Sequence, residues 1–210
     1  MGAKDWMLVY ASGDVSKVLR AAPEIDREAT AALVERLYPA HDIRPIADGN
    51  LGRGNPPEGE IYAAVFPCLS IVCTRDAAGD APTELGRRFV REAAGRTLYL
   101  HAMHSVVDFF AYAIWEPDGT VRRSFSLSPD SGVIEDIGTP LPFEEKYLAG
   151  DREFLDSLDE DDEYPFRFHP LDLAEAALRA LFGFTYEGAC EDDDPALEDI
   201  VLAGFAVTPR

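Results

Sequence analysis

The clearest alternation of apolar and polar side chains lies in residues 97–128, TLYLHAMHSVVDFFAYAIWEPDGTVRRSFSLS. Within it, Glu116–Thr120 has proline and aspartate where a type I turn needs them, and Gly119 where a left-handed residue closes a hairpin loop. The turn predicts one almost wholly apolar face, with the pairs Trp115–Val121, Ala113–Arg123, Ala111–Phe125 and Phe109–Leu127. A shift of one residue would expose this set, so the pattern fixes the register and predicts a buried core face. One strand over 97–116 would greatly exceed the usual length of about five or six residues, so we expect a bend near His104–Val107 and a three-stranded meander.

Weaker periodicity predicts the remaining elements. Apolar runs predict strands at 6–11, 41–47, 61–66, 69–74 and 200–207, and Pro45 puts the second of these at a sheet edge. Helical spacing predicts helices capped by Asp26 and Thr83, and one that begins at Pro170 and ends at Gly183. Residues 128–150 are rich in proline, glycine and serine and indicate a loop.

The order of these elements favours the α+β class. Consecutive strands outnumber crossover helices, so we expect a mostly antiparallel or mixed sheet with about three helices packed on it. We assign residues 1–188 to a single domain and take residues 189–210, an acidic segment and a final strand, as part of it.

The negative charge of the chain limits the classes of partner that it can bind. The formal net charge is −20, and residues 141–210 carry 19 acidic against 5 basic side chains. Such a surface disfavours nucleic-acid binding, which needs basic groups against the phosphates, and favours a basic protein partner. The acidic stretch Asp151–Glu163 indicates an exposed loop, and its run Asp159–Glu163 and the run Glu191–Asp194 lack the glycine and ligand spacing of a calcium loop and indicate solvated loops. The sequence shows neither a membrane-spanning apolar run nor the layout of a signal peptide, so we expect a cytoplasmic protein.

Two of the four histidines suggest candidate chemistry. His101, His104 and Asp108 are groups that can bind zinc, iron or manganese, or support acid–base catalysis. Residues three apart on a regular strand face opposite sides, so the two histidines converge only if the chain bends between them. The competing interpretation is that they are core histidines bonded to backbone, because H-x-x-H alone is not a specific metal motif. We therefore expect no cofactor and no metal, and keep a site on His101 and His104 as the weaker alternative.

Other polar groups favour ordinary structural roles. Ser124, Ser126 and Ser128 lack the turn that a serine nucleophile needs and indicate polar decoration of a strand. Arg122 and Arg123 indicate surface ion pairs, worth about 0–1 kcal/mol. The three cysteines are too few and too irregular for a disulfide framework, and we expect buried thiols.

Four segments also carry a resemblance. They are MGAKDWMLVYASGDV, GRTLYLHAMHSVVDFFAYAIW, SLSPDSGVIEDIGTPLPFE and FHPLDLAEAALRALFGFTYEG. Together they resemble a family of uncharacterised actinobacterial proteins, known as a domain of unknown function, over nearly the whole chain up to Gly188. The resemblance implies a bacterial, cytosolic, single-domain protein, and it brings no activity or catalytic residue with it.

Two hypotheses follow. The first is a non-enzymatic cytosolic binding or regulatory protein that uses an acidic surface. The alternative is a small metal-dependent or acid–base enzyme centred on His101, His104 and Asp108, which requires these side chains to meet in a pocket.

Overall fold

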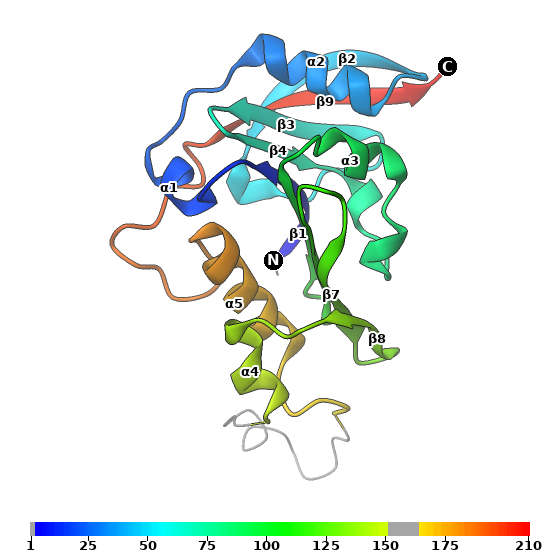
Figure 1. The fold of residues 1–210 in the computed structure, drawn as a ribbon. Coiled ribbons are helices and arrows are strands. Elements are labelled where there is room, and N and C mark those ends of the chain that lie inside the picture. The colour runs from blue at the N-terminus through cyan, green and yellow to red at the C-terminus, as the bar shows by residue number, and fades with distance from the viewer. Residues whose placement is uncertain (1–2, 151–163) are drawn as a thin grey trace.

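Nine strands of the described residues pair into one sheet. In the computed structural model, which describes residues 3–150 and 164–210, every pairing between neighbouring strands is antiparallel (Figure 1). The spatial order is β2-β9-β3-β4-β1-β5-β6-β7-β8. The strands are β1 Lys4–Ala11, β2 His41–Asn50, β3 Glu60–Phe66, β4 Leu69–Cys73, β5 Thr97–His104, β6 Phe109–Trp115, β7 Val121–Ser128, β8 Gly132–Gly138 and β9 Val201–Pro209. We expected a mostly antiparallel or mixed sheet, and the structure has the antiparallel form; β2 lies at an edge as Pro45 predicted.

Helices cover both faces of this sheet, and the described residues contain more of them than expected. They are α1 Val15–Arg20, α2 Arg27–Leu37, α3 Arg87–Glu92, α4 Pro142–Leu148 and α5 Pro170–Phe182. Side chains of α1, α4 and α5 join one core cluster, and those of α2 and α3 join the other. The estimate of about three helices was therefore too low, and the sheet is the dominant element. Within the described ranges, no helix is both long and apolar enough to cross a bilayer.

Local sequence explains where the helices begin and end. The Asp26 side chain accepts the Ala29 amide at the start of α2, and α5 runs from Pro170 to a left-handed Gly183 with φ 78°, as predicted. The helix after Thr83 begins later than predicted, at Arg87, because the two residues before it are extended. The sequence analysis missed α4 and β8 within residues 128–150.

The meander is present, but its register differs from the prediction beyond the first pair. Trp115 faces Val121 as predicted, and the chain turns back directly after His104. A bulge then leaves Arg122 outside the ladder, so Ile114 faces Arg123 and Phe125 faces Tyr112. The other three predicted pairs, Ala113–Arg123, Ala111–Phe125 and Phe109–Leu127, are therefore wrong by one residue.

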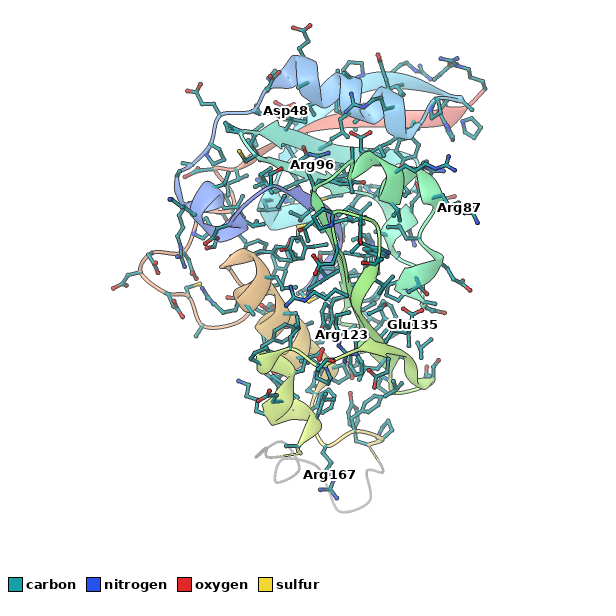
Figure 2. All side chains as sticks on the ribbon, in the orientation of Figure 1. Asp48, Arg87, Arg96, Arg123, Glu135 and Arg167 are labelled. Carbon is teal, nitrogen blue, oxygen red and sulfur yellow. The ribbon has the colours of Figure 1, made fainter. Side chains whose placement is uncertain are left out.

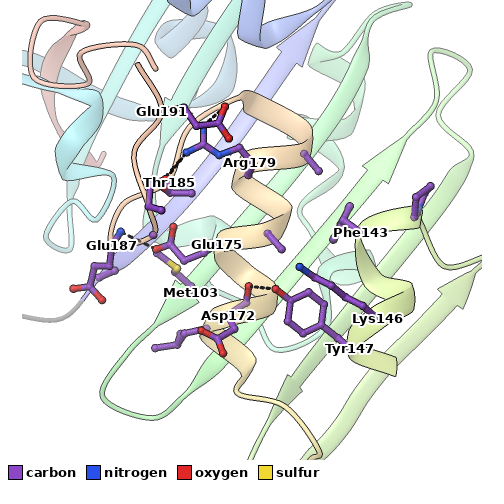
Figure 3. A pocket seen from close by; sticks show the side chains of 17 residues that line it. Met103, Phe143, Lys146, Tyr147, Asp172, Glu175, Arg179, Thr185, Glu187 and Glu191 are labelled. Carbon is purple, nitrogen blue, oxygen red and sulfur yellow. Dashed lines mark hydrogen bonds and ion pairs between the residues drawn. The ribbon is translucent and has the colours of Figure 1, made fainter. Parts of the chain in front are cut away.

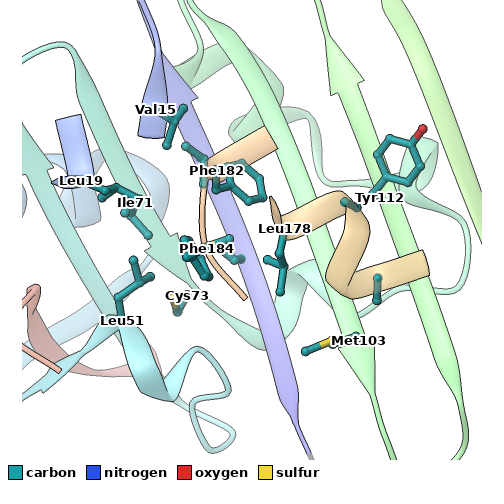
Figure 4. Packing of buried hydrophobic residues seen from close by; sticks show 14 of the residues in the cluster. Val15, Leu19, Leu51, Ile71, Cys73, Met103, Tyr112, Leu178, Phe182 and Phe184 are labelled. Atoms are coloured by element: carbon teal, nitrogen blue, oxygen red, sulfur yellow. The ribbon is translucent and has the colours of Figure 1, made fainter. Parts of the chain in front are cut away.

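The bulge distributes the meander over two cores. Phe125 and Leu127 pack on the α5 side, whereas Phe109 and Trp115 pack on the α2–α3 side. All four are buried, as predicted, although they do not share a face. Figure 4 shows the α5 side, where Leu178 and Phe182 meet side chains from the sheet. Among the cysteines only Cys73 is buried; Cys68 and Cys190 are exposed, against expectation.

Candidate functional site

His101 lies on β5, on the face that α5 covers. Its side chain is fully buried, with Nδ1 3.0 Å from both carboxylate oxygens of Asp5 and Nε2 3.1 Å from the Ala174 carbonyl oxygen. A carbonyl only accepts hydrogen bonds, so Nε2 carries a proton in this arrangement. Burial raises the pKa of Asp5, and the neighbouring imidazole partly opposes that shift. Both ring nitrogens thus have protein partners, and His101 ties β1, β5 and α5 together inside the core.

His104 lies on the opposite face of the sheet from His101. Its ring packs against Trp6, with the centroids 5.8 Å apart, and its Nδ1 accepts the Val106 amide at 3.2 Å. Burial, with the nearby charges of Lys4 and Arg75, lowers the pKa of His104 from its usual 6.5. A neutral imidazole is therefore its state at pH 7.

Asp108 lies in the turn between β5 and β6 and meets a different set of side chains. Its carboxylate accepts the Tyr164 hydroxyl at 3.2 Å and lies 3.5 Å from His169 Nε2. The three expected site residues are therefore not brought together. The reason is the position of the bend, which follows His104 instead of falling between the two histidines, so strand alternation separates them.

A buried polar network occupies a place that the sequence analysis assigned to the surface. The Arg123 side chain, labelled in Figure 2, is fully buried, and its Nε donates to both carboxylate oxygens of Glu144, at 2.9 and 3.0 Å. The Tyr112 hydroxyl donates to the same carboxylate, and Arg123 Nη1 donates to Asp136 at 2.5 Å. The expectation of surface ion pairing is wrong for Arg123. The network fastens α4, which carries Glu144, to β6, β7 and β8.

With α4 fixed in this way, a groove opens between it, α5 and the segment 185–191 (Figure 3). We call it the α4–α5 groove, and its volume is about 780 Å³. Apolar and small side chains in its lining are Ala3, Met103, Pro142, Phe143, Leu171, Ala176, Ala180 and Ala189. Charged side chains in its lining are Lys146, Asp172, Glu175, Arg179, Glu187 and Glu191.

The charges of the groove are not equivalent. Glu175 is half-buried and accepts the amides of Tyr186 and Glu187 at 2.9 and 3.1 Å, so it holds the 185–191 segment against α5. Burial raises the pKa of Glu175. Arg179 donates to Asp194 at 2.8 Å and to the Ala189 carbonyl at 2.8 Å, so its charge is largely compensated. The groove therefore presents a net negative rim beside an apolar lining.

An acidic trio beside the groove is the one described group of side chains spaced for a cation. Carboxylate oxygens of Glu191, Asp193 and Asp194 lie within 4.8 Å of one another. All three already face arginines, since Asp194 binds Arg179, Glu191 lies 4.0 Å from Arg179 and Asp193 lies 3.3 Å from Arg20. These ion pairs weaken the trio as a metal site.

Comparison with known proteins places the chain in a family. Residues 5–205 match the model of a family described as a family of unknown function, DUF6928. The chain belongs to this family. No curated protein and no solved structure matches it. The family assignment agrees with the resemblance to a domain of unknown function, and its description names no activity for the groove.

Only part of the groove was detectable in the sequence. On α5, Asp172, Glu175 and Arg179 recur three and four residues apart, on the side away from the buried stripe, which marks a polar face. The α4 wall gave no comparable signal, because a helix of 7 residues between prolines and glycines is too short to show periodicity.

Proposed function

We propose that this protein is a non-enzymatic binding or regulatory protein of the bacterial cytoplasm, and that its α4–α5 groove binds a basic amphipathic helix of a partner protein. The observation that carries the proposal is the combination, in one cavity of about 780 Å³, of an apolar lining and a carboxylate rim. Peptide grooves that take a helix have this composition, since the apolar face of the ligand is buried and its charged flanks meet opposite charges.

The shape of α5 supports a helical ligand. Ala176 and Ala180 are four residues apart, so they lie on one stripe of α5, where they let another backbone approach closely. With 13 residues, α5 is about 20 Å long, enough to contact three to four turns of a partner helix.

The charge supports a basic ligand. Four carboxylates line the groove against Lys146 and Arg179, and Arg179 is already paired with Asp194. The whole chain adds a long-range field, because its net charge is −20. Such a field raises the association rate of a cationic partner and makes it dependent on salt.

A designed peptide tests this proposal. The probe is a fluorescein-labelled helix of 14 residues with leucines on one face and lysines on the other, and its binding is followed by fluorescence anisotropy. Glu187→Lys reverses an exposed charge of the groove, and Glu198→Lys makes the same change outside it. We expect about tenfold weaker binding for the first and less than about twofold for the second.

A steric pair separates the groove from general charge attraction. Ala180→Trp fills the groove, whereas Ala196→Trp places the same side chain on an exposed site elsewhere. Binding should be lost only in the first variant. Equal effects within either pair would show that the peptide follows the overall charge, and the groove would have to be abandoned as the binding site.

The enzyme hypothesis on His101, His104 and Asp108 gains no support from the geometry, but it has a direct test. Metal ligands must lie around one ion, and these side chains point to different places. We expect zinc, manganese and iron(II) to leave the melting temperature unchanged in the wild type and in His101→Ala and His104→Ala. A metal-dependent gain in the wild type that both substitutions abolish would instead favour the enzyme.

A further inference from the structure

A second, smaller cavity lies on the other face of the sheet from the α4–α5 groove. Its volume is about 320 Å³, and it opens where β1, β5 and β6 approach the turn at residues 105–108. The neighbouring residues Met103 and His104 on β5 face opposite sides of the sheet: Met103 lines the groove, and His104 lines this cavity. The two sites are therefore separate and can be tested one at a time.

Aromatic rings form one part of this cavity. Trp6, His104 and Phe109 all line it, and Phe109 pairs directly with His104 across the β5–β6 ladder. The rings of Trp6 and His104 are tilted by 46° to each other at 5.8 Å, an arrangement that presents ring faces and edges to a common space. Trp6 and Phe109 are each 7% exposed, so the core holds both rings in place.

Carboxylates form the other part. Asp80 and Asp130 also line the cavity and come from segments on either side of it, before the 82–84 turn of helix and after β7. The three rings therefore face two negative charges that different parts of the chain supply. Lys4 and Arg75 lie close enough to affect His104, but neither lines the cavity.

The state of His104 fits a cationic ligand. Its Nδ1 accepts the Val106 amide, so the neutral ring carries its proton on Nε2 and adds no positive charge to the cavity. Next to it, Val107 lines the cavity and is 50% exposed, which gives the entrance an apolar lip. Rings, carboxylates and an apolar lip together suit a weakly hydrated cation that carries alkyl groups.

We propose that this cavity, which we call the Trp6 cavity, binds a small organic cation with an alkylated ammonium group. Aromatic faces attract such a cation through their negative quadrupole, and the methyl groups contact the rings directly. Asp80 and Asp130 supply the countercharge. A hard cation such as Ca²⁺ or Mg²⁺ fits less well, since it needs oxygen ligands on several sides and the rings of Trp6, His104 and Phe109 offer none.

Choline chloride is the probe, and 3,3-dimethyl-1-butanol is its uncharged counterpart of the same shape. Binding is measured by titration calorimetry at pH 7.5, with sodium chloride added to equal ionic strength. We expect choline to bind and the alcohol to bind at least about tenfold more weakly, because only choline gains from the rings and the carboxylates. Equal affinity for the two would mean an apolar cavity without cation recognition, and absence of choline binding would overturn the proposal outright.

Variants locate the bound cation. Asp80→Asn and Asp130→Asn change exposed carboxylates, so we expect the fold to stay intact, and each should weaken choline binding about fivefold. Asp192→Asn removes an exposed charge outside the cavity and should leave choline binding unchanged. Trp6→Leu, with folding checked by circular dichroism, should weaken binding further. Equal losses in all three aspartate variants would show diffuse attraction to an acidic protein and contradict a site at the Trp6 cavity.

Discussion

The buried carboxylate of Glu144 provides the sharpest test of the fold. Both Glu144 and Arg123 have side chains that are 0% exposed, and the carboxylate accepts from Arg123 Nε, the Tyr112 hydroxyl and the Leu141 amide. Burial raises the pKa of Tyr112 far above its usual range, so this hydroxyl stays a neutral donor. Glu144→Gln keeps the volume but removes the negative charge, and it turns an amide NH₂ toward groups that are themselves donors.

The expected loss of stability in Glu144→Gln depends on the partners that Arg123 keeps. Removing one member of a buried ion pair typically costs about 3–5 kcal/mol, because the other charge stays buried. Arg123 still has Asp136, whose side chain is 55% exposed, so we expect a loss at the lower end, about 3 kcal/mol. Glu145→Gln changes the next residue of the same helix, which is exposed, and should stay within about 0.5 kcal/mol of the wild type.

Urea unfolding, followed by tryptophan fluorescence, measures both free energies of unfolding. A double-mutant cycle with Arg123→Met adds a second readout, because residues in one buried network should couple by more than about 1 kcal/mol. If Glu144→Gln and Glu145→Gln have the same stability within error, the network is solvated and the position of α4 derived from it is wrong.

Three further predictions concern stability. Phe125 is 1% exposed, so Phe125→Ala should lower the free energy of unfolding in urea by about 3–5 kcal/mol. Val133 is 52% exposed, so Val133→Ala should lower it by less than about 1 kcal/mol. Similar losses of stability in the two variants would contradict the described core. Residues 141–210 carry 19 acidic against 5 basic side chains, so the excess negative charges repel one another and the melting temperature should rise between low and moderate sodium chloride. A flat or falling value would mean that these charges are already compensated. The hydrogen bond from Arg179 lowers the pKa of Asp194 from 3.8, so the ionised carboxylate stabilises the folded protein above pH 3.8, and this stabilisation is lost as the pH falls through the lowered pKa. The difference in free energy of unfolding between wild type and Asp194→Asn should therefore shrink on acidification. A difference that grows would refute this ion pair.

The sequence predicted the elements that depend on local patterns. The turn at Glu116–Thr120, the capped start of α2 and the Pro170-to-Gly183 helix all follow from short-range chemistry, and all are present. The register of β6 against β7 did not follow, because a bulge at Arg122 has no signature in the alternation of side chains. Once the bulge is included, Phe125 moves to the other face while remaining buried.

Arg123 shows why the candidate site was harder to predict than the fold. An arginine beside serines on a strand indicates solvent, yet Ser124, Ser126 and Arg123 are all buried. The buried carboxylate that pairs with Arg123 is Glu144, 21 residues further along the chain, and that partner is recognisable only after α4 is placed. The groove depends on the same placement, so composition could suggest an acidic surface but could not locate it.

The position of β9 has a consequence for how the protein is made. This strand lies inside the sheet, between β2 and β3, and the edge strand β2 forms its ladder of hydrogen bonds with β9. During translation β9 leaves the ribosome after every other described strand, so until then β2 lacks its partner and β3 is an open edge. Open edges invite pairing with other chains, and contacts between such distant segments form slowly. We therefore expect a nascent chain halted before residue 201 to bind holdase chaperones and to aggregate when released without them, while its meander of β5, β6 and β7 can already be formed.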